Sequence, residues 1–483
     1  MKDSKLDIFL SFVPVLAIVI LLSLVIHFFG SSALDGGSQV CLIIGAAICS
    51  AIGVFRFKIG WTVFERKLKD GVSDVAVAII ILLLIGALSS MWILSGVVPM
   101  LIYYGLEIIH PSFFLVCTCV ICCIVSVMTG SSWTTIATIG IALLGIGQAQ
   151  GFHPGLIAGA IISGSYFGDK ISPLSDTTVL ASSMGGTPLF EHIRYMLITT
   201  TPTMIITLVI FTVIGLQHQV ADSSDIQAYM SAIEGKFNMS IWLLIVPILT
   251  FVMIAKKFPA IVVLALSSFL GAIFALIFQM PVLLEIAPFG DSTASQAFTG
   301  VINGFYGSTS VSMSDPRVES LVSTRGMCGM LNTIFLILSA MCFGATMNAS
   351  GNIRRITSLI VPLAKRRTSL VASTVGTGVL LNTLIADQYL SIILTSHIYR
   401  DIYEKKGYEN RLLSRSMEDS CTVTSPLIPW SSCGMTQATI LSVPTLTYLP
   451  YCFFNIISPL MSIFIAFIGY KIHKREPAPE TEE

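Results

Sequence analysis

The chain has 483 residues, with 27 basic and 27 acidic side chains, so its formal net charge is zero and gives no reason to expect nucleic-acid binding. Hydrophobic residues make up 54% of the sequence and charged residues only 11%, whereas soluble domains average roughly 25% charged. Together with a mean hydropathy of +0.84, these values exclude a soluble globular fold and predict an all-α polytopic membrane protein, with the lipid bilayer as its partner.

Apolar segments follow one another along the whole chain, and a spanning helix needs about 20 mainly apolar residues. The first follows Lys2 and Lys5 and is longer than the roughly 7–15 residues of a signal-peptide core, so we expect a retained helix. The clear segments are 7–29, 39–55, 72–95, 112–129, 133–150, 192–215, 240–255, 258–280, 327–347 and 449–470. Less regular segments are 97–109, 154–167, 171–190, 369–398 and 418–447. We expect about eleven to thirteen membrane segments, some of them broken or re-entrant.

Basic side chains concentrate in short loops, and such loops face the cytoplasm. The stretches rich in Lys or Arg are 56–70, 256–257, 353–368, 400–415 and 471–475. The longer loops 216–238 and 281–326 hold only Lys236, Arg317 and Arg325 among Lys and Arg, so they should face outward. Both termini are therefore expected in the cytoplasm.

Segment 369–398 lies between two of the basic loops, so it must enter the membrane and return. Polar residues at its middle include Asn382, Thr383, Asp387 and Gln388. A polar turn at that depth is tolerated only where protein buries it or where it lines a cavity.

The chain carries two proline-broken polar stretches, GDKISPLSDTT at 168–178 and EDSCTVTSPLIPWSSCG at 418–434. Charges at membrane depth cost several kcal/mol and mark functional sites. A pair of such breaks, one in each half of the chain, indicates a secondary transporter built from repeated halves.

A possible first-half counterpart of the Asp387 turn is MTGSSWTT at 128–135. Ser131 lies 42 residues before Pro173, and Asp387 lies 39 before Pro426. This loose equivalence favours a two-fold internal repeat of inverted topology. The expected parts are N-terminal helices in 1–71, a first transport half in 72–280, an extracytoplasmic connecting loop in 281–326, a second transport half in 327–472 and a cytoplasmic tail in 473–483.

Proline inside a helix frees the carbonyl four residues earlier. Pro173, Pro426 and Pro429 would free the carbonyls of Asp169, Thr422 and Ser425. Each of these lies beside hydroxyls and a carboxylate, an all-oxygen environment that suits a hard cation such as Na⁺.

Several carboxylates are candidates for the exchange of a cation against a proton. Burial favours the protonated form of a carboxyl, and a nearby cation favours the ionised form, so Na⁺ and H⁺ compete for the same group. The candidates are Asp169, Asp176, Asp387, Glu418 and Asp419, with Na⁺ expected at one of the four aspartates. Lys170 either neutralises a carboxylate when no ion is bound or pairs with one structurally. The alternative for Asp169, Lys170 and Asp176 is a solvated helix end, and Glu418 could simply end the preceding charged loop.

At GSSWTT, GDKISPLSDTT and EDSCTVTSPLIPWSSCG the chain resembles the NhaC family of bacterial Na⁺/H⁺ antiporters, from about residue 70 onward. The resemblance implies an exchanger of the bacterial inner membrane that moves a cation out against protons. It places near the transport path Asp169, Ser172, Asp176, Thr177, Asp387, Glu418, Asp419 and Ser425. Ser431 stands where we expect Asn in the family, which bears on cation preference or substrate class.

Three functions are compared. The leading hypothesis is Na⁺/H⁺ exchange by alternating access, for which Asn at Asp169 or Asp176 should abolish transport. The second is a Na⁺- or H⁺-coupled exchanger of organic acids, such as malate and lactate, or a related anion or amino acid carrier. The third is a passive channel. No nucleophile–base pair, phosphate loop, zinc spacing or disulfide framework occurs, so neither an enzyme nor a cofactor is expected, and assembly as a homodimer is left open.

Overall fold

The computed structural model describes residues 4–29, 36–218, 223–313, 319 and 322–472. Across these residues the regular structure is helical, apart from one isolated bridge between Thr309 and Thr324. The predicted all-α polytopic class is confirmed. The predicted tail 473–483, Lys2 and Arg317 lie outside the described residues.

Nine helical segments of the described chain are long and apolar enough to cross a membrane. They are Leu6–Val25 within α1 (Lys5–Phe29), α2 (Gly37–Phe55), α3 (Trp61–Leu94), α5 (Pro111–Thr129), Ser132–Ala149, α10 (Leu189–Gln217), α13 (Ala260–Phe278), Met327–Ala349 and α19 (Arg367–Ile385). The segment Ser132–Ala149 comprises α6 (Ser132–Thr135), a π-helical turn and α7 (Ile141–Ala149), and Met327–Ala349 contains α17 (Leu331–Ala349). A tenth span is bent by 56° between α23 (Thr445–Tyr448) with its following turn and α24 (Phe453–Ile468).

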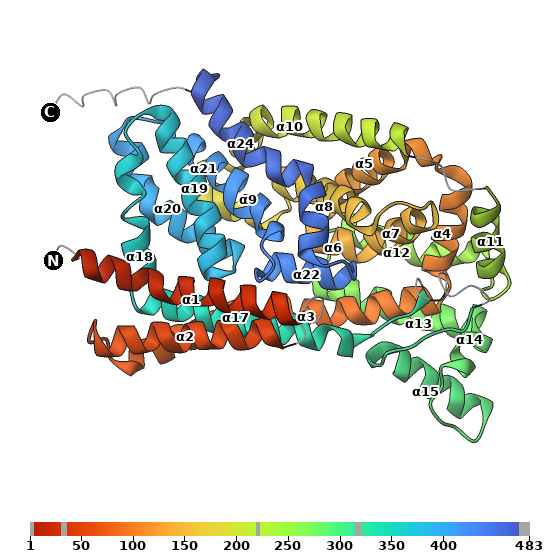
Figure 1. Ribbon diagram of the computed structural model, residues 1–483. Coiled ribbons are helices and arrows are strands. Elements are labelled where there is room, and N and C mark those ends of the chain that lie inside the picture. Colours follow the sequence, from red (N-terminus) through yellow and green to blue (C-terminus); the bar gives the residue numbers. More distant parts are fainter. Residues whose placement is uncertain (1–3, 30–35, 219–222, 314–318, 320–321, 473–483) are drawn as a thin grey trace.

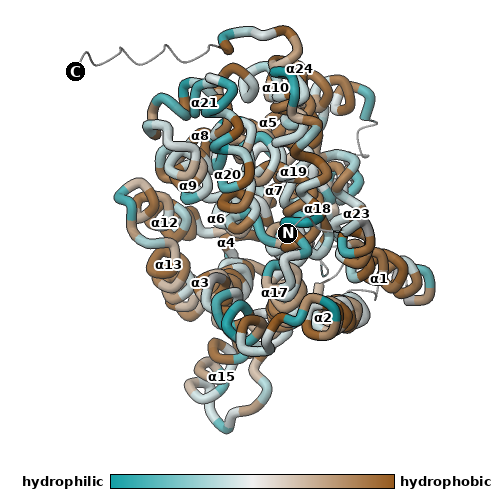
Figure 2. The backbone as a smooth tube through the Cα atoms, turned by 90° about the vertical axis from the view of Figure 1, so that its left-hand side faces the viewer, coloured by the Kyte–Doolittle hydropathy of each residue, from teal (hydrophilic) through white to brown (hydrophobic). Residues whose placement is uncertain are grey.

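The other segments form shorter or more polar helices. They are α4 (Val97–Ile108), α8 (Pro154–Ile171), α9 (Asp176–Gly185), α12 (Ile245–Ala255), α20 (Gln388–Lys405), α21 (Asn410–Met417) and α22 (Ser432–Ile440). The segment 240–255, predicted as a clear span, thus forms only the shorter apolar helix Ile241–Ala255, which ends in α12. Figure 1 shows α1, α2, α17 and α3 side by side along one edge of the molecule. Viewed end-on in Figure 2, α6, α7 and α20 lie centrally, while α1, α2, α3, α12 and α13 lie towards the rim.

The basic loops meet at one end of the molecule, at the left in Figure 1. Arg56 Nη2 forms an ion pair of 3.0 Å with Asp7 Oδ1, and the Arg355 guanidinium lies 3.7 Å from the centre of the Phe57 ring. Two hydrogen bonds to carbonyl groups add to these contacts, from Lys406 Nζ to Lys365 at 2.9 Å and from Arg367 Nε to Ala466 at 2.8 Å. We call this the basic end.

The two longer loops meet at the opposite end, which carries α11 (Ser223–Glu234), α14 (Met280–Glu285) and α15 (Thr293–Tyr306) (Figure 1). An ion pair of 2.6 Å joins Lys236 to Glu285 across these loops. The separation of basic and non-basic loops predicted from the sequence is therefore present in the fold. Which end faces the cytoplasm stays a prediction.

Two helical hairpins enter the molecule from opposite ends. The first consists of α5 and the segment Ser132–Ala149, and its open end is closed by a hydrogen bond of 2.9 Å from Gln150 Nε2 to the Ile109 carbonyl. The second consists of α19 and α20 and opens at the basic end, where Lys406 binds the Lys365 carbonyl. Their tips therefore point towards each other inside the protein.

The two tips have the same backbone design. Each first helix ends in a left-handed residue, Gly130 with φ 67° and Ala386 with φ 63°. The next residue caps the second helix: Ser131 Oγ accepts from the Thr134 amide at 3.2 Å, and Asp387 Oδ1 accepts from the Leu390 amide at 3.0 Å. A helix N-terminus needs such acceptors because its first amides have no partner within the helix.

Two interrupted helices complete the core. α8 ends at Ile171, and α9 begins at Asp176 behind the N-cap Ser175. α21 continues through a π-helical turn, Glu418–Thr422, and a 3₁₀ turn, Ser425–Leu427, before α22 begins behind the N-cap Ser431. The chain thus leaves regular α-helix near the prolines singled out in the sequence.

The tips and breaks share one register. Four positions recur 256 residues later: Gly130 at Ala386, Ser131 at Asp387, Pro173 at Pro429, and Ser175 at Ser431. The two left-handed turns and the two serine caps thus occupy equivalent places in the two halves of the chain.

Candidate functional site

Asp169 joins the first hairpin tip to the first helix break. It lies in the last turn of α8 and is 5% exposed. Its Oδ2 accepts hydrogen bonds from Ser132 Oγ at 2.6 Å and the Ser132 amide at 3.3 Å, and its Oδ1 accepts from Ser175 Oγ at 2.6 Å. The carboxylate is therefore held entirely by neutral donors.

The backbone carbonyl groups at the break between α8 and α9 accept hydrogen bonds from a side chain. The Thr178 hydroxyl donates to the carbonyls of Asp169 and Lys170, both at 2.9 Å. The Ser172 hydroxyl donates to the Val127 carbonyl at 2.8 Å and so ties the break to α5. The Asp169 carbonyl, which Pro173 was expected to free, thus accepts a hydrogen bond from the Thr178 hydroxyl. Its second lone pair remains able to bind another partner.

A cavity of about 620 Å³ leads from Asp169 to the turn between α12 and α13. Its polar lining comes from Ser131, Thr134, Asp169, Asp176, Thr177 and Gln388. It also reaches Lys257 and Phe258, which are exposed in the turn before α13. A small hydrated ion can thus approach Asp169 from that turn.

Asp176 and Thr177 differ in their surroundings although they are neighbours. Asp176 is exposed at the cavity wall as the first residue of α9. Thr177 is buried, and its hydroxyl lies 3.0 Å from Ser175 Oγ. The hydroxyls of Ser132 and Ser175 therefore bind Asp169, and the Thr177 hydroxyl lies between Ser175 and the cavity that Thr177 and Asp169 both line.

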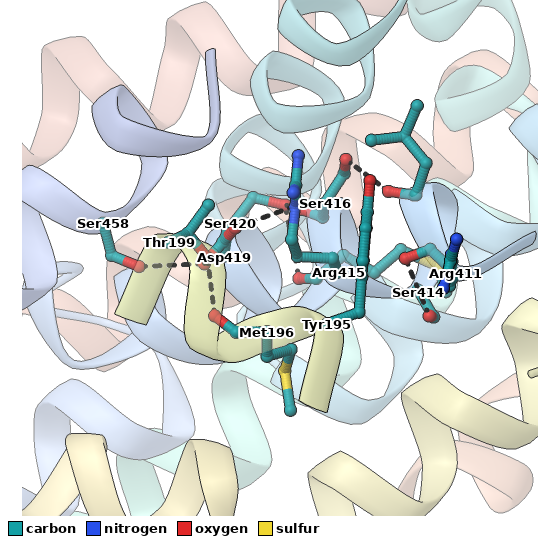
Figure 3. Close-up of polar contacts among 12 residues, drawn as sticks. Tyr195, Met196, Thr199, Arg411, Ser414, Arg415, Ser416, Asp419, Ser420 and Ser458 are labelled. Carbon is teal, nitrogen blue, oxygen red and sulfur yellow. Dashed lines mark hydrogen bonds and ion pairs between the residues drawn. The ribbon is translucent and has the colours of Figure 1, made fainter. Parts of the chain in front are cut away.

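A second buried carboxylate, Asp419, is held by a cation. Lys170 Nζ forms an ion pair with Asp419 Oδ1, and both side chains are fully buried. The same oxygen accepts from Thr199 Oγ1 at 3.2 Å and Ser458 Oγ at 3.1 Å (Figure 3). Lys170 thus links the first interrupted helix to the second, and α10 and α24 supply the neutral donors.

Glu418 stands beside this pair on the π-helical turn. Its side chain is fully buried, and neither carboxylate oxygen has a hydrogen-bond partner among the residues that the structure describes. It interacts electrostatically with Asp169 and Lys170. The buried Thr422 hydroxyl is likewise without a partner in the described part of the chain. π-Helical turns often occur at functional sites, because the extra residue reorients side chains.

Asp387 belongs to a separate polar cluster at the second hairpin tip. Besides capping α20, it accepts from Ser432 Oγ at 3.3 Å, and the Ser432 amide donates to the Ala386 carbonyl at 2.8 Å. The Ser425 carbonyl, which Pro429 was expected to free, accepts from Ser431 Oγ. These contacts place Asp387 at the second hairpin tip and Ser425 in the neighbouring break.

One orientation prediction was wrong. Arg415 was assigned to the basic loop 400–415, but it lies in α21 with its side chain fully buried, near Asp419. Composition alone predicts that a basic residue at the end of a charged loop is exposed to water, so it did not indicate that Arg415 is buried. The available signal was its spacing four residues before Asp419, which puts both on one helix face. The structure also adds Ser175, Thr199 and Ser458, whose hydroxyls look ordinary in sequence.

Comparison with known proteins identifies the family of the chain. A model of the "Na+/H+ antiporter family" matches residues 6–184 and 164–470. The Na(+)/H(+) antiporter NhaC of Alkalihalophilus pseudofirmus is 36% identical over 437 residues, 90% of either chain. The malate-2H(+)/Na(+)-lactate antiporter of Bacillus subtilis is 36% identical over 471 residues, 97% of this chain and 96% of that one. The arginine/ornithine antiporter ArcD of Halobacterium salinarum is 32% identical over 458 residues, 92% of this chain and 90% of that one.

These matches confirm the resemblance that the polar motifs predicted, and they extend it over nearly the whole chain. The chain belongs to the Na⁺/H⁺ antiporter family.

Proposed function

We propose that this protein is a secondary active antiporter that exchanges Na⁺ for H⁺ by alternating access, with Asp169 as the carboxylate shared by the two ions. The observation that carries the proposal is the position of Asp169, buried between a hairpin tip and a helix break on a cavity that reaches the exposed turn between α12 and α13. Family membership supports the exchange reaction.

The surroundings of Asp169 suit a hard monovalent cation. Its neighbours are the hydroxyls of Ser132, Ser175 and Thr177, which can turn from donating a proton to offering a lone pair. Oxygen-only ligands of this kind favour ions such as Na⁺ over soft metals.

Exchange follows from the cost of an uncompensated buried charge. Either a bound Na⁺ or a proton neutralises Asp169, and the two compete for it. An empty, ionised carboxylate is costly to carry through an apolar interior. The protein therefore changes its open side with one ion or the other bound.

We assign the basic end to the cytoplasm and the protein to the bacterial inner membrane, because short loops rich in Lys and Arg stay inside. The turn at Lys257, which the cavity reaches, is also basic, so we assign this state as inward-open. The constant offset of 256 residues and the hairpins opening at opposite ends support two inverted repeats, which can rock about the site between them.

The test is proton movement in proteoliposomes of the purified protein, followed with a pH-sensitive dye. After a proton gradient is imposed, adding Na⁺ alone should collapse it in the wild type. Asp169→Asn should remove the response, because an amide cannot exchange a proton for a cation. For Asp176→Asn the sequence alone predicts loss of transport, but Asp176 is exposed at the cavity wall. We therefore expect this variant to weaken the apparent Na⁺ affinity, because it removes an attractive charge on the entry route.

Two results would count against this function. A normal response in Asp169→Asn would remove Asp169 from the mechanism. A wild type that ignores Na⁺, Li⁺ and K⁺ but responds once malate and lactate are supplied would establish organic acid exchange instead, the activity named for one of the relatives.

A further inference from the structure

Arg415 is a buried cation whose hydrogen-bonding capacity is unused. Its side chain is fully buried, and none of its three nitrogens has an acceptor within the described residues. The ring of Tyr195 lies 4.6 Å from its Cζ, and an ion pair runs from its Nε to Asp419 Oδ2 over 3.9 Å. A guanidinium has five N–H donors, and burying them without acceptors is unfavourable.

Asp419 is complementary to this arrangement. Its Oδ1 takes three donors, including Lys170, whereas its Oδ2 takes no hydrogen bond in the described part of the chain. Figure 3 shows Asp419 with Thr199 and Ser458 on one side and Arg415 on the other. Charge-assisted N–H···O bonds measure about 2.7–2.9 Å, so a shift of about 1 Å would let Arg415 bind the free oxygen.

The two cations beside Asp419 belong to different interrupted helices, which the proposed alternating access would move relative to each other. Lys170 is on α8, the first interrupted helix, whereas Arg415 and Asp419 are four residues apart on the second. When one half rocks against the other, the contact of Lys170 with Asp419 is stretched, but the spacing of Arg415 and Asp419 is kept by their shared helix. Removing the partner of a buried charge is strongly destabilising.

We propose that Arg415 is a positioning residue that takes over Asp419 when Lys170 separates from it during the transport cycle. The inference rests on the alternating-access antiport proposed above, and it adds the step by which a buried carboxylate stays paired in both states. Tyr195 permits this movement, because a guanidinium over a ring face has no directional hydrogen bond to break.

Three variants isolate the charge at this position. Arg415→Gln removes the charge, and Arg415→Lys keeps it. Arg411→Gln is the matched control, because Arg411 lies one turn earlier, stacks on the same Tyr195 ring at 4.9 Å, and pairs with Glu409 and Glu191 at the surface instead of Asp419. We expect Arg415→Gln to lower the maximal Na⁺/H⁺ exchange rate by about tenfold or more with the Na⁺ KM unchanged. Arg415→Lys should retain most of the rate, and Arg411→Gln all of it.

A second readout reports which state the protein occupies and needs no transport. Ala78 lines the cavity, so a cysteine placed there reacts with a water-soluble maleimide while the cavity is open. Arg415→Gln should increase the rate of labelling, since loss of the reserve partner favours the state in which Lys170 holds Asp419. Labelling of the same protein without the added cysteine gives the background.

The outcomes separate the two proposals. If the wild type does not exchange Na⁺ for H⁺, the proposed function fails, while the labelling experiment still tests Arg415. If Arg415→Gln matches Arg411→Gln in rate and labelling, or if Arg415→Lys is as defective as Arg415→Gln, the takeover of Asp419 is wrong. Should Arg415→Gln not fold, equal labelling in Arg415→Lys and the wild type supports the proposal, and increased labelling overturns it.

Discussion

The two buried aspartates of the core, Asp169 and Asp419, have different partners and therefore different capabilities. Asp169 is held by hydroxyls, which can rotate to make room for a cation or a proton. Asp419 is held by an ammonium group, which competes with any incoming cation. Burial is similar at both residues, so the nature of the donors decides which carboxylate can exchange its ion.

The role of the hydroxyls around Asp169 can be tested at Ser132. Ser132→Ala removes a 2.6 Å hydrogen bond and a cation ligand, and hydrogen bonds to charged groups contribute roughly 1.5–3 kcal/mol. We expect the Na⁺ KM for proton flux to rise by about tenfold or more, measured by varying Na⁺ in proteoliposomes. Ser163→Ala is the matched control on α8, because the buried Ser163 hydroxyl has no partner in the described residues. Equal KM values in the two variants would contradict the prediction.

The hairpin tips show how one backbone conformation is met by two different residues. Both Gly130 and Ala386 are left-handed, but only Gly130 has no room for a side chain. A Cβ at Gly130 would lie 2.6 Å from the carbonyl carbon and oxygen of Leu174, in the break that carries Pro173. The first tip therefore depends on glycine for close contact with the break.

This difference predicts opposite tolerance at equivalent positions. Gly130→Ala should destabilise the protein by more than the about 1–2 kcal/mol of left-handed strain, because the clash with Leu174 is added. Ala386→Gly should be near neutral, since relief of strain offsets the lost methyl packing. The two variants can be compared by heating the protein in detergent and measuring the fraction that remains folded by size-exclusion chromatography. An unfolding midpoint for Gly130→Ala equal to that of the wild type would show that the tip can move away from the break.

At the scale of the whole molecule, the end opposite the basic loops is closed by the ion pair of Lys236 and Glu285. Burial by itself raises the pKa of the Glu285 carboxyl, but hydrogen bonds from Lys236 and Ser312 outweigh it and hold the pKa below its ordinary value. A lowered pKa stabilises the folded state above the ordinary pKa of Glu, and this contribution is lost as pH falls through the lowered value.

Glu285→Gln should therefore lower the unfolding midpoint at neutral pH by an amount that corresponds to about 0.5–1 kcal/mol, given the partial exposure of the pair. The difference from the wild type should shrink as the pH falls below the ordinary pKa of Glu. Asp291→Asn, an exposed carboxylate of the same loop, serves as control. A deficit in Glu285→Gln that stays constant down to acidic pH would mean that packing, not charge, holds this end.

Hydropathy predicted most of the spans, but 240–255 forms a shorter helix and 449–470 lies in a bent pair. Polar residues within apolar blocks were sufficient to find the breaks. The offset of 256 residues was missed, because the sequence comparison paired Pro173 with Pro426. Pro429 is the residue that lies 42 positions after Asp387, as Pro173 lies 42 after Ser131. The pairing of Lys170 with Asp419 spans 249 residues. No local pattern reports such a contact, because only the packing of both halves brings the two residues together.

The depth of the candidate site is set by chain length. The return arm Ser132–Ala149 and the following α8 each contain 18 residues, about 27 Å of helix. The chain runs away from the tip along Ser132–Ala149 and returns along α8. Because the two helices have the same length, the end of α8 lies level with the tip, and Asp169 contacts Ser132. One residue more or less in either arm would move its end by about 1.5 Å and turn it by about 100°. The equal lengths of these two helices therefore set the position of Asp169 relative to Ser132. We expect insertions and deletions to be tolerated only in the loops outside the two helices.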